Sequence, residues 1–88
     1  MKLYVVTYYD YSRIVEYLIF DNLDSAITQF VKSIKHSDWY DISLNTATPA
    51  PETGFYEETV MVSSNRKKEL KYNTEDPEVI EKITKAMA

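Results

Sequence analysis

The alternation of hydrophobic and polar positions first predicts two β-strands. Leu3 to Tyr9 reads LYVVTYY and Ile14 to Phe20 reads IVEYLIF, and both segments are dominated by β-branched and aromatic residues. Both alternating faces of the first segment are largely apolar, which is typical of a strand in the middle of a sheet. The polar residues between the two segments are turn formers. The pattern therefore predicts an N-terminal hairpin whose first strand is central.

The spacing of hydrophobic positions then changes to that of a helix, twice. Over residues 23–34 apolar side chains recur at intervals of three and four, which predicts an amphipathic helix with Asn22 as its N-cap. Near the C-terminus, Asp76 followed by Pro77 is typical of a helix start, because proline lacks the N–H that a first helical position leaves unpaired. The apolar stripe of this second helix is Val79, Ile80, Ile83 and Met87.

Three further strands are expected between the helices, over residues 39–46, 55–63 and 69–72. In the first of them, polar residues alternate with apolar ones, so the face that carries Ser43 and Asn45 is expected to meet water. Residues 47–54, ATPAPETG, are expected to form a loop, because two prolines interrupt the segment and Gly54 ends it. The low hydrophobicity of the last strand favours a place at the edge of the sheet.

The expected fold is therefore a single compact α+β domain over residues 1–88, with element order β-β-α-β-β-β-α. Each helix has one apolar stripe that must be buried against a common sheet face. We expect an antiparallel sheet of four or five strands with two helices on one face. The opposite face has no predicted cover.

Composition narrows the classes of function. The 88 residues include no cysteine and one glycine, so disulfides, thiolate metal sites and Gly-rich phosphate loops are not expected. No apolar run approaches the roughly 18 residues of a membrane span, and no signal peptide is expected. The 14 acidic and 10 basic residues give a net charge of −4, which weighs against nucleic acid as a partner. We expect a cytoplasmic protein with no cofactor, no metal and no membrane contact.

Tyrosines are concentrated near the N-terminus, where five of the eight lie within the first seventeen residues. Strict alternation in the second strand groups Ile14 with Leu18 and Phe20 on one face and places Val15, Tyr17 and Ile19 on the other. With either assignment an apolar, aromatic patch remains uncovered, and such patches commonly mark an interface. The candidate partner-binding residues are Tyr8, Tyr9, Tyr11, Tyr17 and Tyr40. The alternative interpretation is the ordinary preference of tyrosine for strands and cross-strand pairs.

No other group of residues indicates catalysis. His36, the single histidine, is explained by its place at the end of the first predicted helix, where positive charge is favourable. Glu57 and Glu58 are adjacent in a strand and point to opposite faces, so they cannot share a substrate proton. No pattern of metal ligands is present. We therefore expect that this protein is not an enzyme.

The leading hypothesis is a small non-enzymatic protein–protein interaction module that binds through its tyrosine-rich sheet face. Its partner is another protein or a second copy in a homodimer, and size and composition resemble those of virus-encoded inhibitors of host enzymes. Substituting Tyr8, Tyr9 or Tyr11 should then weaken binding with little loss of stability. The alternative is a nucleic-acid binding module that uses the basic turn of Arg66, Lys67 and Lys68 beside aromatic strands. A third interpretation is a small-molecule or enzymatic function at the 47–54 loop, because loops often carry functional residues.

Overall fold

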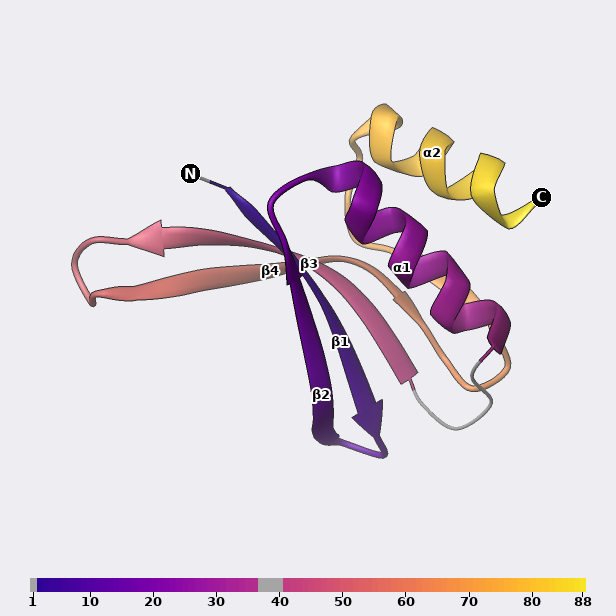
Figure 1. Ribbon diagram of the computed structural model, residues 1–88, viewed down its shortest axis with the longest axis horizontal. Coiled ribbons are helices and arrows are strands. Elements are labelled where there is room, and N and C mark those ends of the chain that lie inside the picture. Colours follow the sequence, from indigo (N-terminus) through magenta and orange to yellow (C-terminus); the bar gives the residue numbers. More distant parts are fainter. Residues whose placement is uncertain (1, 37–40) are drawn as a thin grey trace.

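A computed structural model describes residues 2–36 and 41–88 of the chain and confirms the predicted order of elements (Figure 1). The elements are β1 (Leu3–Asp10), β2 (Arg13–Phe20), α1 (Leu23–His36), β3 (Asp41–Ala50), β4 (Phe55–Ser64), β5 (Leu70–Tyr72) and α2 (Pro77–Met87). They form an α+β fold. Tyr40, one of the candidate anchors, lies outside the described residues.

The strands form one antiparallel sheet in the order β2-β1-β3-β4-β5. The predicted central position of the first strand is confirmed, because β1 lies between β2 and β3. The short β5 is at one edge, as its polar sequence indicated, and β2 forms the other edge. The β1–β2 hairpin and the far part of the β3–β4 hairpin diverge strongly in direction (Figure 1). The sheet is therefore twisted into two arms that extend from a common centre.

The expected loop over residues 47–54 is wrong. β3 continues through Pro49 to Ala50, and only a four-residue turn, residues 51–54, connects it to β4. Pairing of β3 with β1 ends at Ala47, so Pro49 lies where β3 has a partner on one side only. A proline is tolerated at such a position because no second neighbour needs its missing N–H.

Two β-bulges change which side chains share a face. One bulge lies in β2 opposite Tyr8 and Tyr9, where Val15 is the additional residue. The other lies in β4 opposite Leu44 and Asn45, where Met61 is the additional residue. An inserted residue reverses the alternation beyond it. The predicted grouping of Ile14 with Leu18 and Phe20 is therefore wrong, because Ile14 shares a face with Tyr17 and Ile19.

Both predicted helix starts are confirmed by their capping hydrogen bonds. The backbone N–H of Ser25 donates to Asn22 Oδ1 at 2.8 Å, and that of Glu78 donates to Asp76 Oδ1 at 3.0 Å. The two helices are joined at their surface by Lys82, whose Nζ lies 2.6 Å from Asp24 Oδ1 of α1. Neither of the two helices described is long and apolar enough to cross a membrane.

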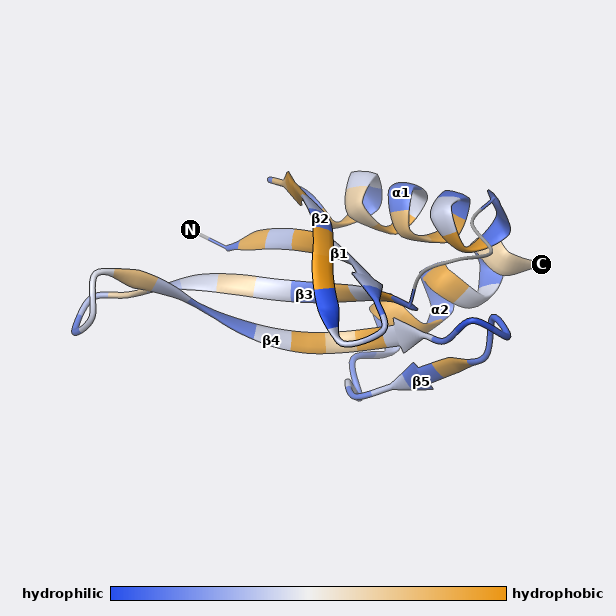
Figure 2. Cartoon of the chain, turned by 90° about the horizontal axis from the view of Figure 1, so that it is seen from below, coloured by the Kyte–Doolittle hydropathy of each residue, from blue (hydrophilic) through white to orange (hydrophobic). Residues whose placement is uncertain are grey.

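The core lies between the helices and one face of the sheet. Its largest fully buried side chains are Phe30, Ile34, Ile42, Leu44, Ile83, Val6, Val62 and Val79. Figure 2 shows hydrophobic residues on the side of α1 that faces the strands. It also shows hydrophobic residues along β2, and the helices do not cover all of them. The opposite sheet face is not covered by either helix, and it is where the candidate site lies.

Candidate binding groove on the open sheet face

The open sheet face has a buried floor, although no helix covers it. The floor consists of side chains from the two middle strands: Val5 and Thr7 of β1, and Ser43, Asn45 and Ala47 of β3. Each of them is at most 6% exposed. The expectation that Ser43 and Asn45 face water is therefore wrong. The twist of the sheet curls the flanking strands over this centre, and side chains from those strands shield it.

Large side chains from the flanking strands form two walls. On the β2 side these are Ile14, Tyr17 and Ile19, and on the β4 side they are Tyr56, Glu58 and Val60. Tyr17 is 60% exposed, Ile19 57% and Tyr56 52%. Apart from Ser43 and Val60, which share this face but do not line the hollow, these residues enclose a groove of about 570 Å³, and Leu3 and Tyr9 complete its lining. We call this hollow the sheet groove.

Two polar side chains that line the sheet groove, Asn45 and Glu58, are hydrogen bonded to each other. Glu58 stands opposite Ala47, and Asn45 stands opposite Val60, so the two side chains are diagonal neighbours on the open face. Asn45 Nδ2 donates to Glu58 Oε1 at 3.2 Å. The other end of the amide, Asn45 Oδ1, is buried and has no hydrogen-bond partner among the described residues. Leaving a buried acceptor unpaired costs about 1–3 kcal/mol.

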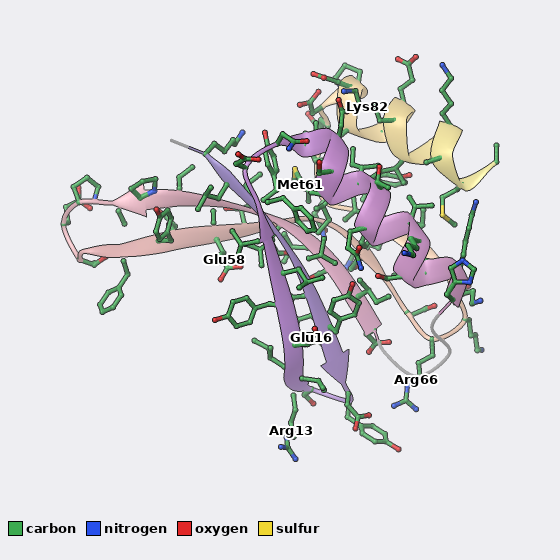
Figure 3. The ribbon with its side chains drawn as sticks, viewed as in Figure 1. Arg13, Glu16, Glu58, Met61, Arg66 and Lys82 are labelled. Carbon is green, nitrogen blue, oxygen red and sulfur yellow. The ribbon has the colours of Figure 1, made fainter. Side chains whose placement is uncertain are left out.

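The neighbour of Asn45 fixes which way its amide points. If the amide were turned over, its oxygen would face the Glu58 carboxylate, and two acceptors would then oppose each other. The observed orientation places the donor on Glu58 and leaves the acceptor of a groove-lining residue without a donor among the described residues. Glu58 is exposed and has no ion pair among the described residues (Figure 3). The groove therefore presents acceptors and a negative charge without a cation.

The candidate tyrosines have different environments. Tyr9 and Tyr17 belong to the sheet groove, and Ser43 Oγ donates to the Tyr9 hydroxyl at 3.5 Å. Tyr11 is 75% exposed in the β1–β2 turn, outside the groove. Tyr8 lies on the helix side of the sheet and is 8% exposed, so the structure removes it from the open face. The sequence analysis did not identify Asn45, Glu58 or Tyr56 as site residues.

Tyr8 is part of a buried polar network under α1, and this gives a first prediction. Its hydroxyl is hydrogen bonded to Ser33 Oγ and accepts from Gln29 Nε2 at 3.0 Å. Tyr8→Phe should lower the free energy of unfolding by about 0.5–1.5 kcal/mol, since the partners lose a hydrogen bond inside the protein. Urea denaturation followed by circular dichroism measures this change.

Tyr17→Phe is the matched control, because the Tyr17 side chain is mostly exposed. It should change the free energy of unfolding by less than about 0.5 kcal/mol. Equal losses in the two variants would contradict the placement of Tyr8 in the core and of Tyr17 on the surface.

Arg66 of the basic turn makes an ion pair and a cation–π contact within the chain. Arg66 Nη2 lies 3.3 Å from Asp10 Oδ1, and its guanidinium carbon lies 4.4 Å from the centre of the Tyr11 ring. These contacts connect the β4–β5 turn to the β1–β2 turn. Lys68 has a left-handed backbone with φ of 64°. None of the described residues that line the sheet groove is a lysine, an arginine or a histidine, so the basic turn and the groove are separate surfaces.

Comparison of the chain with protein-family models, with curated proteins and with solved structures finds no match, so function must be inferred from the sheet groove itself.

Proposed function

We propose that this protein is a binding module that receives a segment of another protein in the sheet groove. The observation that carries the proposal is the set of apolar walls: Ile14, Tyr17, Ile19 and Tyr56 are all more than half exposed around one hollow. Isolated exposed apolar residues are ordinary, but a contiguous group around a groove is typical of an interaction site. Tyrosine also suits an interface, because it offers a large rigid contact area and a hydroxyl that tolerates water.

A partner of a different sequence is favoured over a second copy. If two copies met groove to groove about a twofold axis, their Glu58 carboxylates would enter the same interface. Like charges in a partly desolvated interface repel each other. A different protein is free of this conflict and can supply complementary charge, which the net charge of −4 also favours.

The test compares capture of proteins from a lysate of the source organism by three forms of the tagged chain. The wild type and Phe55→Glu should retain the same stoichiometric protein, and Ile19→Glu should lose it. Phe55 is 75% exposed at the start of β4 and does not line the sheet groove, so it controls for adding a charge to an exposed apolar position. Placing a charge on a groove wall should weaken binding at least tenfold, as for residues central to interfaces.

Circular dichroism spectra must show that all three forms are folded. Retention of the same protein by Ile19→Glu would contradict the proposal. So would recovery of nucleic acid in place of protein, if its release on raising the salt concentration showed phosphate binding.

A further inference from the structure

We infer that the sheet groove recognises an arginine side chain of its protein partner, with the guanidinium between Asn45 Oδ1 and the Glu58 carboxylate. This inference rests on the proposed function and adds the chemistry of the partner. The polar atoms that carry it are a buried acceptor without a partner and an exposed carboxylate without a cation among the described residues. Asn45 Oδ1 lacks a donor and the Glu58 carboxylate lacks a cation among the described residues, and a positively charged donor supplies both.

The buried amide is the first element of the argument. Asn45 is 5% exposed, and its Nδ2 is already committed to Glu58 Oε1 at 3.2 Å. The unpaired atom is the oxygen, so the missing group in the groove must donate a hydrogen bond. A ligand carboxylate placed beside Asn45 would face the Glu58 carboxylate as well as the amide oxygen, and the repulsion between the two charges disfavours an anionic segment as the occupant.

The charge of the site is the second element. Among the described lining residues Glu58 is the one charged side chain. The two arginines of the chain, Arg13 and Arg66, both lie away from Glu58 (Figure 3). Arg66 is paired with Asp10. The chain therefore does not neutralise Glu58 with its own guanidinium groups, and the position is open to a cation from outside.

The shape and polarity of the walls favour arginine over lysine. The guanidinium has five donors in a planar fork and no acceptor, so it can donate to the carboxylate and to the amide oxygen together. Its methylene stem can lie along Val5 and Ile19, and the Tyr17 and Tyr56 rings can attract the cation. A lysine ammonium is a strongly hydrated point charge and loses more on entering an apolar groove.

The structure places a bulge directly beside the site. The irregularity between Leu44 and Asn45 lies opposite Met61, one residue from Val60. Bulges are common next to functional sites because they redirect side chains. Here the bulge reverses the alternation in β4, so Glu58 and Val60 point to the open face while Val62 points to the core.

The inference is tested with N-acetyl-arginine methylamide as the probe and the citrulline analogue as its control. Citrulline has nearly the same shape but is uncharged. In ¹H–¹⁵N NMR titrations of the full chain, the arginine probe should shift the Asn45 side-chain amide with a dissociation constant on the order of a few millimolar, as a ligand of this size allows. The citrulline probe should bind at least about tenfold more weakly, because it lacks the charge-assisted hydrogen bonds.

Glu58→Gln should weaken the arginine probe at least about tenfold and remove its preference over citrulline. The neighbouring Glu57→Gln is the control, because it removes the same charge from the opposite face of β4 and should leave binding unchanged. Glu57 and Glu58 are both exposed, so both variants should fold. Equal binding of the two probes, absence of a response at Asn45, or an equal effect of Glu57→Gln would overturn the inference.

The two proposals fail in different ways. If Ile19→Glu no longer binds the captured protein while Glu58→Gln binds it with unchanged affinity, the groove binds a protein but does not recognise an arginine side chain of it. If the arginine probe binds as expected and no protein depends on Ile19, the proposed function fails and the cation site remains. A dimer that forms through the groove and is lost in Arg13→Gln would replace the foreign partner with a second copy.

Discussion

Phe30→Ala should lower the free energy of unfolding by about 3–5 kcal/mol, the largest loss expected for a single substitution in this chain. Phe30 is fully buried at the centre of α1 and belongs to the cluster that packs between the helices and the sheet. Its removal leaves a cavity in the main contact between the two layers. A domain of this size has a total stability of roughly 4–13 kcal/mol, so the variant should be close to unfolded at moderate temperature.

Phe55→Ala is the control for Phe30→Ala, because it removes the same side chain from a position that is 75% exposed. Its effect should stay within about 0.5 kcal/mol. Urea unfolding followed by far-ultraviolet circular dichroism compares both variants with the wild type. A loss below about 1 kcal/mol in Phe30→Ala would mean that α1 does not pack on the sheet as described.

Local signals in the sequence were sufficient to predict the elements and their order. The Asn22 and Asp76 caps and the three-and-four spacing over residues 23–34 depend on contacts within one turn of helix. The central place of β1 follows from its two apolar faces. These features need no knowledge of distant residues, and the structure confirms them.

The faces of the strands were harder to predict, because alternation assumes unbroken pairing. Val15 and Met61 are each an additional residue opposite a regular strand, and nothing in their chemistry marks them as bulges. One extra residue moves every following side chain to the other face. Ile14 therefore joined the open face, contrary to prediction. Pro49 led to the wrong prediction of a loop. The strand can include this proline because β1 does not pair with β3 beyond Ala47, and the sequence does not show where that pairing stops.

The candidate site was predicted only in part for the same reason. Tyr9 and Tyr17 were identified from the aromatic composition of the first two strands, and the structure places both in the sheet groove. Asn45 and Glu58 are thirteen residues apart and meet only because of the β3–β4 register. Asn45 also looked like an ordinary solvent-facing position. Its burial arises from the twist of the whole sheet, which no local pattern shows.

On the open sheet face, one group has opposite effects on stability and on the proposed binding. Its floor buries an amide oxygen without a partner, which is unfavourable in the free protein. In the complex proposed above, the same oxygen accepts a hydrogen bond from the ligand. Binding sites commonly retain such unfavourable groups, and replacing them tends to increase stability at the expense of function. If Asn45 is of this kind, its replacement should separate the two properties.

Asn45→Leu should raise the free energy of unfolding by about 1–3 kcal/mol and abolish the response to the arginine probe. Leucine has the same number of side-chain heavy atoms and the same branching as asparagine, and its apolar side chain would lie among Val5, Ala47 and Val60 on the same face. The exposed Glu58 carboxylate loses one neutral hydrogen bond and returns to water, which offsets little of the gain. For a domain of this size the melting temperature should rise by about 4–8 °C for each kcal/mol gained.

Asn45→Asp is the contrasting variant at the same position, because it keeps the size and shape of the side chain but buries a carboxylate next to Glu58. Like charges at this distance and the loss of water around the new charge both disfavour the folded state at neutral pH. Its melting temperature should therefore fall, opposite in sign to Asn45→Leu. If Asn45→Leu instead loses stability and Asn45→Asp gains it, the amide oxygen is not an unpaired acceptor. The arginine site would then lose its principal support.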